Sequence, residues 1–263
     1  MMEAVKQYDH IRVEKNREKK TATIVFDRPE KMNYISMLAR SQFSEIFDEL
    51  NKDDDVRVII IKGEGTQAFS AGGNIPEFME VHPEELSHLA VNVAAPERSP
   101  KPVIAQLQGY TFGVGLEIAM ACDFRIAADD TLLALPEMNL GMIPGSGGTQ
   151  RVAKIAGLTR AKDMIMRARR IPADEAYQWG LITKVVPKTE LENEVHALAD
   201  ELMKFSPLAL KVCKQVLNAA YETPLSAGLE IEGKAYGLLR TTEDFREGVS
   251  AFVEKRKPNF KGK

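Results

Sequence analysis

Short apolar strands alternate with helical patterns along most of this chain, and that alternation constrains the fold most. In the first unit, a helix near residues 36–50 has Leu38, Phe43 and Leu50 on or near one stripe and Ser36 as its N-cap. An apolar strand follows, which completes one crossover unit, and a similar unit comes next. The repetition predicts an α/β domain. The predicted strands lie at residues 11–13, 22–26, 56–61, 103–107, 124–127 and 132–134.

The second half of the chain is mostly helical in pattern. From about Gly145 the sequence predicts helices that end near Gly157 and Gly180, with one late strand at 181–186. Segment 80–101 contains three prolines around a helix-like middle, which predicts a flexible insertion. Further helical patterns cover residues 191–205, 207–221 and 243–253, and residues 224–240 are also compatible with helix.

Composition narrows the class of protein. A chain of 263 residues allows one large domain, or a core domain with a small appended one. The net charge of -3 gives no footprint for nucleic acid. Two cysteines are too few for a disulfide framework, and four histidines without ligand spacing predict no metal site. The start lacks a secretory signal and no apolar run could span a bilayer, so we expect a cytoplasmic protein without a membrane partner.

Two glutamates stand in apolar surroundings. Glu117 interrupts an apolar stretch, and Glu137 follows another and precedes a glycine-rich run from Gly141 to Gly148. Ionisation is costly in dry surroundings, and paired carboxylates there favour acid/base chemistry. The alternatives are a core glutamate that is hydrogen-bonded within the fold for Glu117, and a helix-entry residue for Glu137.

Two glycine turns could supply backbone donors. Residues 69–74 follow a buried strand, and Gly113 opens a helix about one turn before Glu117, so both turns could expose N–H groups to developing negative charge. The glycine-rich run 141–148 could wrap around a ligand. Each of these segments could also be an ordinary structural turn or loop.

In this order, the motifs resemble the enoyl-CoA hydratase/isomerase family, also called crotonases, from about Ile11 to Lys261. The resemblance implies a spiral of ββα units over residues 1–190 with an acyl-CoA site. It also implies a C-terminal helical trimerisation region at 191–263, with trimers often stacked into hexamers. No cofactor is implied, because coenzyme A is part of the substrate. The matching segments are 27–33, 69–74, 101–105, 109–123, 136–151 and 251–257.

The resemblance also implies roles for residues. The N–H groups of Ala71 and Val114 match the family's oxyanion hole, which holds the thioester oxygen. Glu117 matches the carboxylate that activates water, and Glu137 the one that protonates Cα; a chain with both is expected to be an enoyl-CoA hydratase. The implied coenzyme A contacts are Lys31, Met32, Gly72, Gly73, Tyr236 and Lys255.

Some positions depart from the family pattern. Val114 stands where many hydratases have glycine, and Asn74 replaces a frequent aspartate. Segment 80–101, which roofs the acyl pocket in relatives, also differs, so a branched, cyclic or dicarboxylic acyl group is expected. The alternatives are an enoyl-CoA isomerase, a ring-cleaving acyl-CoA hydrolase, or a non-catalytic oligomer that binds CoA or RNA.

Overall fold

The computed structural model describes residues 8–263, so the prediction drawn from the first six residues lies outside the described residues. Its strands form a six-stranded sheet in the order β1-β2-β3-β5-β7-β10 and a four-stranded sheet in the order β4-β6-β8-β9. The strands are β1 (Ile11–Asn16), β2 (Thr21–Phe26), β3 (Val58–Gly63), β4 (Ala68–Ser70), β5 (Val103–Leu107), β6 (Tyr110–Phe112), β7 (Phe124–Ala128), β8 (Leu132–Ala134), β9 (Ile171–Pro172) and β10 (Lys184–Val186).

Each turn of the chain adds one strand to each sheet. β3 is followed by β4, β5 by β6, and β7 by β8, and within both sheets these successive strands pair in parallel. Only the outer pairs β1·β2 and β8·β9 are antiparallel in the described chain. This is the predicted spiral of ββα units. β5 and β8 match their predicted bounds, whereas β4, β6 and β9 were not predicted.

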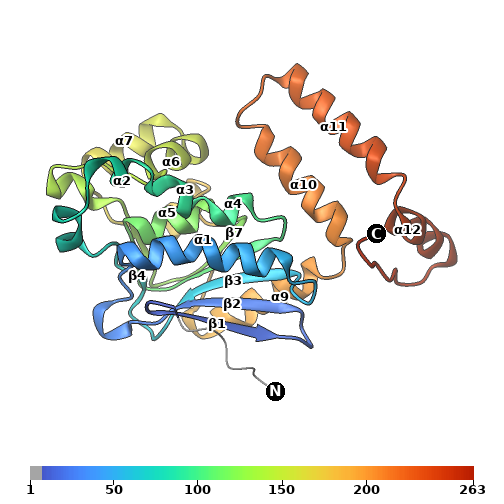
Figure 1. Ribbon diagram of the computed structural model, residues 1–263, viewed down its shortest axis with the longest axis horizontal. Coiled ribbons are helices and arrows are strands. Elements are labelled where there is room, and N and C mark those ends of the chain that lie inside the picture. The colour runs from blue at the N-terminus through green and yellow to red at the C-terminus, as the bar shows by residue number, and fades with distance from the viewer. Residues whose placement is uncertain (1–7) are drawn as a thin grey trace.

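Helix α1 (Met37–Lys52) covers the six-stranded sheet, as Figure 1 shows. The Ser36 side chain accepts a hydrogen bond from the Ala39 N–H, which confirms the predicted N-cap. Phe43 and Leu50 are buried in the core, but Leu38 is 56% exposed. The charged residue Arg40 takes an inward position instead, so one predicted stripe residue was wrong.

Segment 80–101 is folded onto the core rather than standing apart as an insertion. Leu89 and Val93 are buried, and so is Ala95, because three short helices lay this segment over α1 and α5. The helices between α1 and α9 are α2 (Pro83–Ser87), α3 (Leu89–Val93), α4 (Ala95–Arg98), α5 (Val114–Ala121), α6 (Gly148–Ala156), α7 (Leu158–Met166) and α8 (Ala173–Gln178). Among the described residues there are also four 3-10 turns: η1 (Pro29–Lys31), η2 (Ile75–Met79), η3 (Pro136–Leu140) and η4 (Lys188–Glu190).

The C-terminal helices divide by their packing. α9 (Leu191–Leu202) buries Leu191, Val195 and Leu202 against the six-stranded sheet. α10 (Pro207–Ala219), α11 (Leu225–Leu239) and α12 (Glu243–Glu254) extend away from the core, and α11 has no buried residue (Figure 1). The packing within the chain therefore changes after α9. In residues 8–263, no helix is both long and apolar enough to cross a membrane.

Candidate active site

Both glutamates face one small cavity of about 120 Å³. The start of α5 and the turns η2 and η3 surround it, and Leu86 and Leu89 of segment 80–101 cover it. Five further apolar side chains complete the wall: Ile75, Phe78, Leu140, Met142 and Ile143. A larger cavity of about 650 Å³ lies between the core and α10, but neither glutamate lines it.

Glu117 is clamped by two backbone amides. Its side chain is 2% exposed, and Oε1 accepts hydrogen bonds from the Ser146 N–H at 2.7 Å and the Gly148 N–H at 2.9 Å. Burial raises the pKa of this carboxyl, while the two amide donors oppose that rise because they favour the ionised form. The glycine-rich run thus binds a carboxylate of the protein itself.

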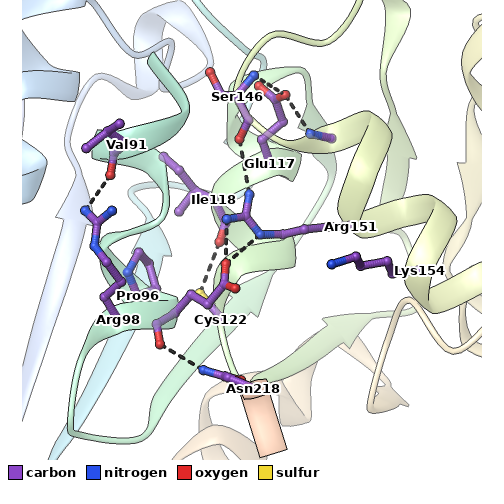
Figure 2. Close-up of polar contacts among 12 residues, drawn as sticks. Val91, Pro96, Arg98, Glu117, Ile118, Cys122, Ser146, Arg151, Lys154 and Asn218 are labelled. Carbon is purple, nitrogen blue, oxygen red and sulfur yellow. Dashed lines mark hydrogen bonds and ion pairs between the residues drawn. The ribbon is translucent and has the colours of Figure 1, made fainter. Parts of the chain in front are cut away.

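A salt bridge holds the loop that carries the first of these amides. The Arg151 guanidinium donates to the Ser146 carbonyl at 3.2 Å and to Glu97 Oε2 at 2.9 Å and 2.5 Å. Figure 2 shows Arg151 reaching from α6 to the Ser146 carbonyl beside Glu117. The Asn218 amide donates to the Glu97 carbonyl at 3.1 Å, which links this network to α10. Arg151 therefore fixes the position of the Ser146 amide.

Glu137 has much poorer polar surroundings. It is the second residue of η3, and its Oε2 is buried without a hydrogen-bond partner among the described residues. Burial, together with the nearby Glu117 charge, raises the pKa of Glu137 to about 7. Much of this carboxyl is therefore protonated near neutral pH, when most glutamates are ionised.

The two glycine turns meet at this cavity. A Cβ added to Gly72 would lie 3.9 Å from the Gly113 Cα, and one added to Gly113 would lie 3.2 Å from Glu137 Oε1. Gly113 has a φ of 52°, which L side chains rarely adopt, and it caps α5. Val114 is the first helical residue, so its N–H has no acceptor within the helix and is available at the cavity wall.

The prediction that the Ala71 N–H is an oxyanion donor stays a prediction. This N–H already donates to the Met32 carbonyl at 2.8 Å, so it is engaged in holding the turn after η1. The Gly73 N–H, two residues on, has no acceptor within residues 8–263, and Gly73 lines the cavity. Gly73 is therefore a second candidate donor in this turn, which the tertiary hydrogen-bond pattern brings out.

Arg40 was not predicted, although it is the only cation that lines the cavity in the described chain. It is 4% exposed, and its charge lies close enough to influence Glu117 and Glu137. The sequence signal was its spacing from Phe43 and Phe47, which places all three on one helix face.

The predicted coenzyme A residues fall into two groups. Met32 follows η1 and is 40% exposed; its carbonyl binds the Ala71 N–H, so this turn borders the cavity turn. Lys31 ends η1 and is also exposed. Tyr236 on α11 and Lys255 after α12 lie on the extended C-terminal helices and do not line the cavity. Within a single chain, Tyr236 and Lys255 therefore do not reach the cavity that holds the two glutamates.

Comparisons with known proteins decide the family. A model of the enoyl-CoA hydratase/isomerase family matches residues 16–263. The chain belongs to the enoyl-CoA hydratase/isomerase family. It is 38% identical over 258 residues to a crotonyl-CoA hydratase of Syntrophomonas wolfei, with 96% of this chain and 98% of the relative covered. It is 35% identical over 245 residues to a short-chain-enoyl-CoA hydratase of Clostridium acetobutylicum, with 92% and 94% covered.

Solved structures of family members share the fold. A crystal structure of an enoyl-CoA hydratase from Bacillus anthracis superposes with a TM-score of 0.90 at 35% identity, covering 97% of this chain and all of that one. One from Geobacillus kaustophilus gives a TM-score of 0.92 at 33% identity, with 98% and 100% covered. The predicted crotonase spiral with a helical C-terminal region is thus confirmed.

Proposed function

We propose that this protein is an enoyl-CoA hydratase, which adds water across the Cα=Cβ bond of a 2-enoyl-CoA thioester or catalyses the reverse dehydration. The observation that carries the proposal is the unequal environment of two carboxylates in one cavity. Glu117 accepts two amide hydrogen bonds, while Glu137 keeps a buried oxygen without a partner. Acid and base roles require such a difference.

In the hydration direction, Glu117 accepts a proton from water as the water oxygen bonds to Cβ. The electron pair of the double bond moves toward the thioester, whose oxygen gains enolate character. The Val114 N–H and an N–H of the turn 71–73 stabilise that oxygen. Glu137 then donates its proton to Cα, which yields a 3-hydroxyacyl-CoA. Before the next cycle Glu117 loses the proton that it gained and Glu137 regains one, by direct transfer or by exchange with solvent.

The cavity favours a short acyl group. Its volume of about 120 Å³ is small beside the roughly 300–1,000 Å³ of pockets that bury drug-sized ligands. Leu86, Leu89 and Phe78 close it, and the Val114 side chain, which is 3% exposed, fills space next to the oxyanion donors. The coenzyme A portion would leave along the turn at Lys31 and Met32.

The test is an assay of crotonyl-CoA hydration by loss of enoyl absorbance, run in water labelled with oxygen-18. Label in a 3-hydroxyacyl-CoA product supports the hydratase. Double-bond migration without label would instead establish the isomerase alternative, and hydrolysis of a ring or thioester would establish the hydrolase. No turnover on any enoyl-CoA would leave the non-catalytic oligomer.

We further propose that the protein self-associates as a trimer or a dimer of trimers through its C-terminal helices. Leu225, Leu229 and Tyr236 of α11 are 78%, 56% and 66% exposed, and Phe252 of α12 is 86% exposed. Exposed apolar patches of this kind mark interaction surfaces. A neighbouring copy could bring Tyr236 and Lys255 to a coenzyme A site that its own chain leaves open. Light scattering measures the assembly, and a monomer would contradict it.

A cytoplasmic location stays a prediction of the sequence.

A further inference from the structure

The catalytic cavity contains one cation whose role the proposed hydration does not use. Arg40 lies on α1 and points inward with Phe43, and its side chain is 4% exposed. It lines the same cavity as Glu117 and Glu137. Charged side chains are almost never this deeply buried unless they are paired, so Arg40 needs an explanation.

The Arg40 guanidinium has no hydrogen-bond acceptor among residues 8–263. Its Nε is buried and unpartnered. Glu77 is the nearby carboxylate outside the catalytic pair, and both of its oxygens are used elsewhere: Oε2 accepts from the Met37 N–H at 2.8 Å and Oε1 from the Asn74 amide at 2.6 Å. Carboxylates therefore lie near the Arg40 guanidinium, but among the described residues none accepts a hydrogen bond from it.

The guanidinium nevertheless occupies a shaped position. A Cβ added to Gly73 would lie 2.5 Å from Arg40 Nη2 and 2.9 Å from Phe78 Cζ, so only glycine leaves room for both. The Arg40 Cζ lies 5.2 Å from the centroid of the Phe78 ring, in the range of a cation–π contact. The fold thus holds the cation beside Gly73 at the cavity wall.

The remainder of the cavity wall around the acyl site is largely apolar. A fully apolar acyl group would leave the Nη donors of Arg40 without acceptors once it displaces water from the cavity, which is costly. An acceptor carried by the substrate removes this cost. Because the group is cationic and presents a planar fork, a carboxylate is the acceptor that fits it best.

We propose that Arg40 binds a carboxylate on the acyl group, so that the preferred substrate is the 2-enoyl-CoA thioester of a short dicarboxylic acid. This inference rests on the proposed function. In it, Arg40 determines specificity, while Glu117 and Glu137 carry out the proton transfers. The small cavity requires that only a few carbons separate Cβ from the carboxylate.

The test compares two substrates of matched shape on one enzyme. 4-Carboxybut-2-enoyl-CoA carries the carboxylate, and 5-methylhex-2-enoyl-CoA has two methyl groups in place of its two oxygens. The selectivity is the ratio of their kcat/KM values in a single preparation, so any loss of folded enzyme cancels. We expect the wild type to favour the carboxylate by about 10- to 100-fold, which is what a hydrogen bond to a charged group provides.

Arg40→Met should abolish or reverse this ratio, and Arg40→Lys should retain part of it because a cation remains without the fork. If Arg40→Met does not fold, the Arg40→Lys ratio and the wild-type ratio still decide the question. A wild-type ratio near one, or an unchanged ratio in a variant that lowers both rates, would mean that Arg40 only tunes the catalytic carboxylates, and would overturn the proposal. If crotonyl-CoA and both probes are all inert, the proposed function has failed instead.

Discussion

Two regions of one cavity give their glutamate side chains opposite polar surroundings. The loop before α6 gives Glu117 two amide donors, and a salt bridge of Arg151 fixes that loop. The η3 turn gives Glu137 little: one of its oxygens is buried without a partner, and burial raises its pKa to about 7. Backbone donors, rather than residue type, therefore decide which glutamate suits the base and which the acid.

Removing either carboxylate should have the largest effect. Glu117→Gln cannot take a proton from water, and Glu137→Gln cannot give one to Cα. Since a positioned acid or base contributes about 10²- to 10⁴-fold, we expect kcat for crotonyl-CoA hydration to fall by that factor in each variant. Thermal denaturation checks that both remain folded. Near wild-type turnover in folded Glu117→Gln or Glu137→Gln would refute the role assigned to that residue.

Disturbing the amide clamp should cost less than removing the carboxylate. In Gly148→Ala the new Cβ would meet Glu117 Oε1 at 3.0 Å and Leu135 Cδ1 at 2.9 Å, so the carboxylate must shift. A misplacement of about 1 Å can lower a rate by about 10²-fold, and we expect a loss of kcat of that order. Gly237→Ala adds the same methyl group in α11, where no atom of the described chain lies within 4 Å, and should leave Glu117 undisturbed. Equal activity of the two variants would show that the clamp is unimportant.

The pH dependence of the hydration rate should report the protonation of Glu137. Hydration needs Glu137 protonated, and its pKa of about 7 in the free enzyme means that the acid form is lost as the pH rises through 7. We expect kcat/KM for hydration to fall above about pH 7, approaching tenfold per pH unit. In the dehydration direction Glu137 acts as the base, so that rate should rise over the same range. A hydration profile that stays flat to pH 9 would contradict the assignment.

Loosening the salt bridge should have the smallest effect. Arg151→Met removes the hydrogen bond to the Ser146 carbonyl and the pairing with Glu97, but leaves both amides of the clamp in the chain. We expect kcat to fall by only a few-fold, because the loop becomes less fixed without losing a donor. Arg98→Met is the matched control, since Arg98 donates to the Val91 carbonyl and lies apart from Glu117 (Figure 2). Equal kcat in both variants would exclude a positioning role for Arg151.

Local patterns predicted much of the fold. β5 and β8 lie at their predicted bounds, and the Ser36 cap and the helix after Gly113 are present. Three strands of the second sheet, β4, β6 and β9, were not predicted, and β4 and β9 are held by neighbours distant in sequence. Segment 80–101 was also misjudged: its prolines suggested an insertion, but burial of Leu89 and Val93 ties it to the core.

By itself, the sequence determined the α/β alternation, the apolar settings of Glu117 and Glu137 and the glycine turn that places Glu117 one helical turn after Gly113. These depend on neighbours within a few residues. Only the tertiary structure decided that the Ala71 N–H donates to the Met32 carbonyl, that Ser146 and Gly148 clamp one glutamate, and that Arg40 lines the cavity. The physical reason is that hydrogen-bond partners and burial are set by segments brought together from distant parts of the chain.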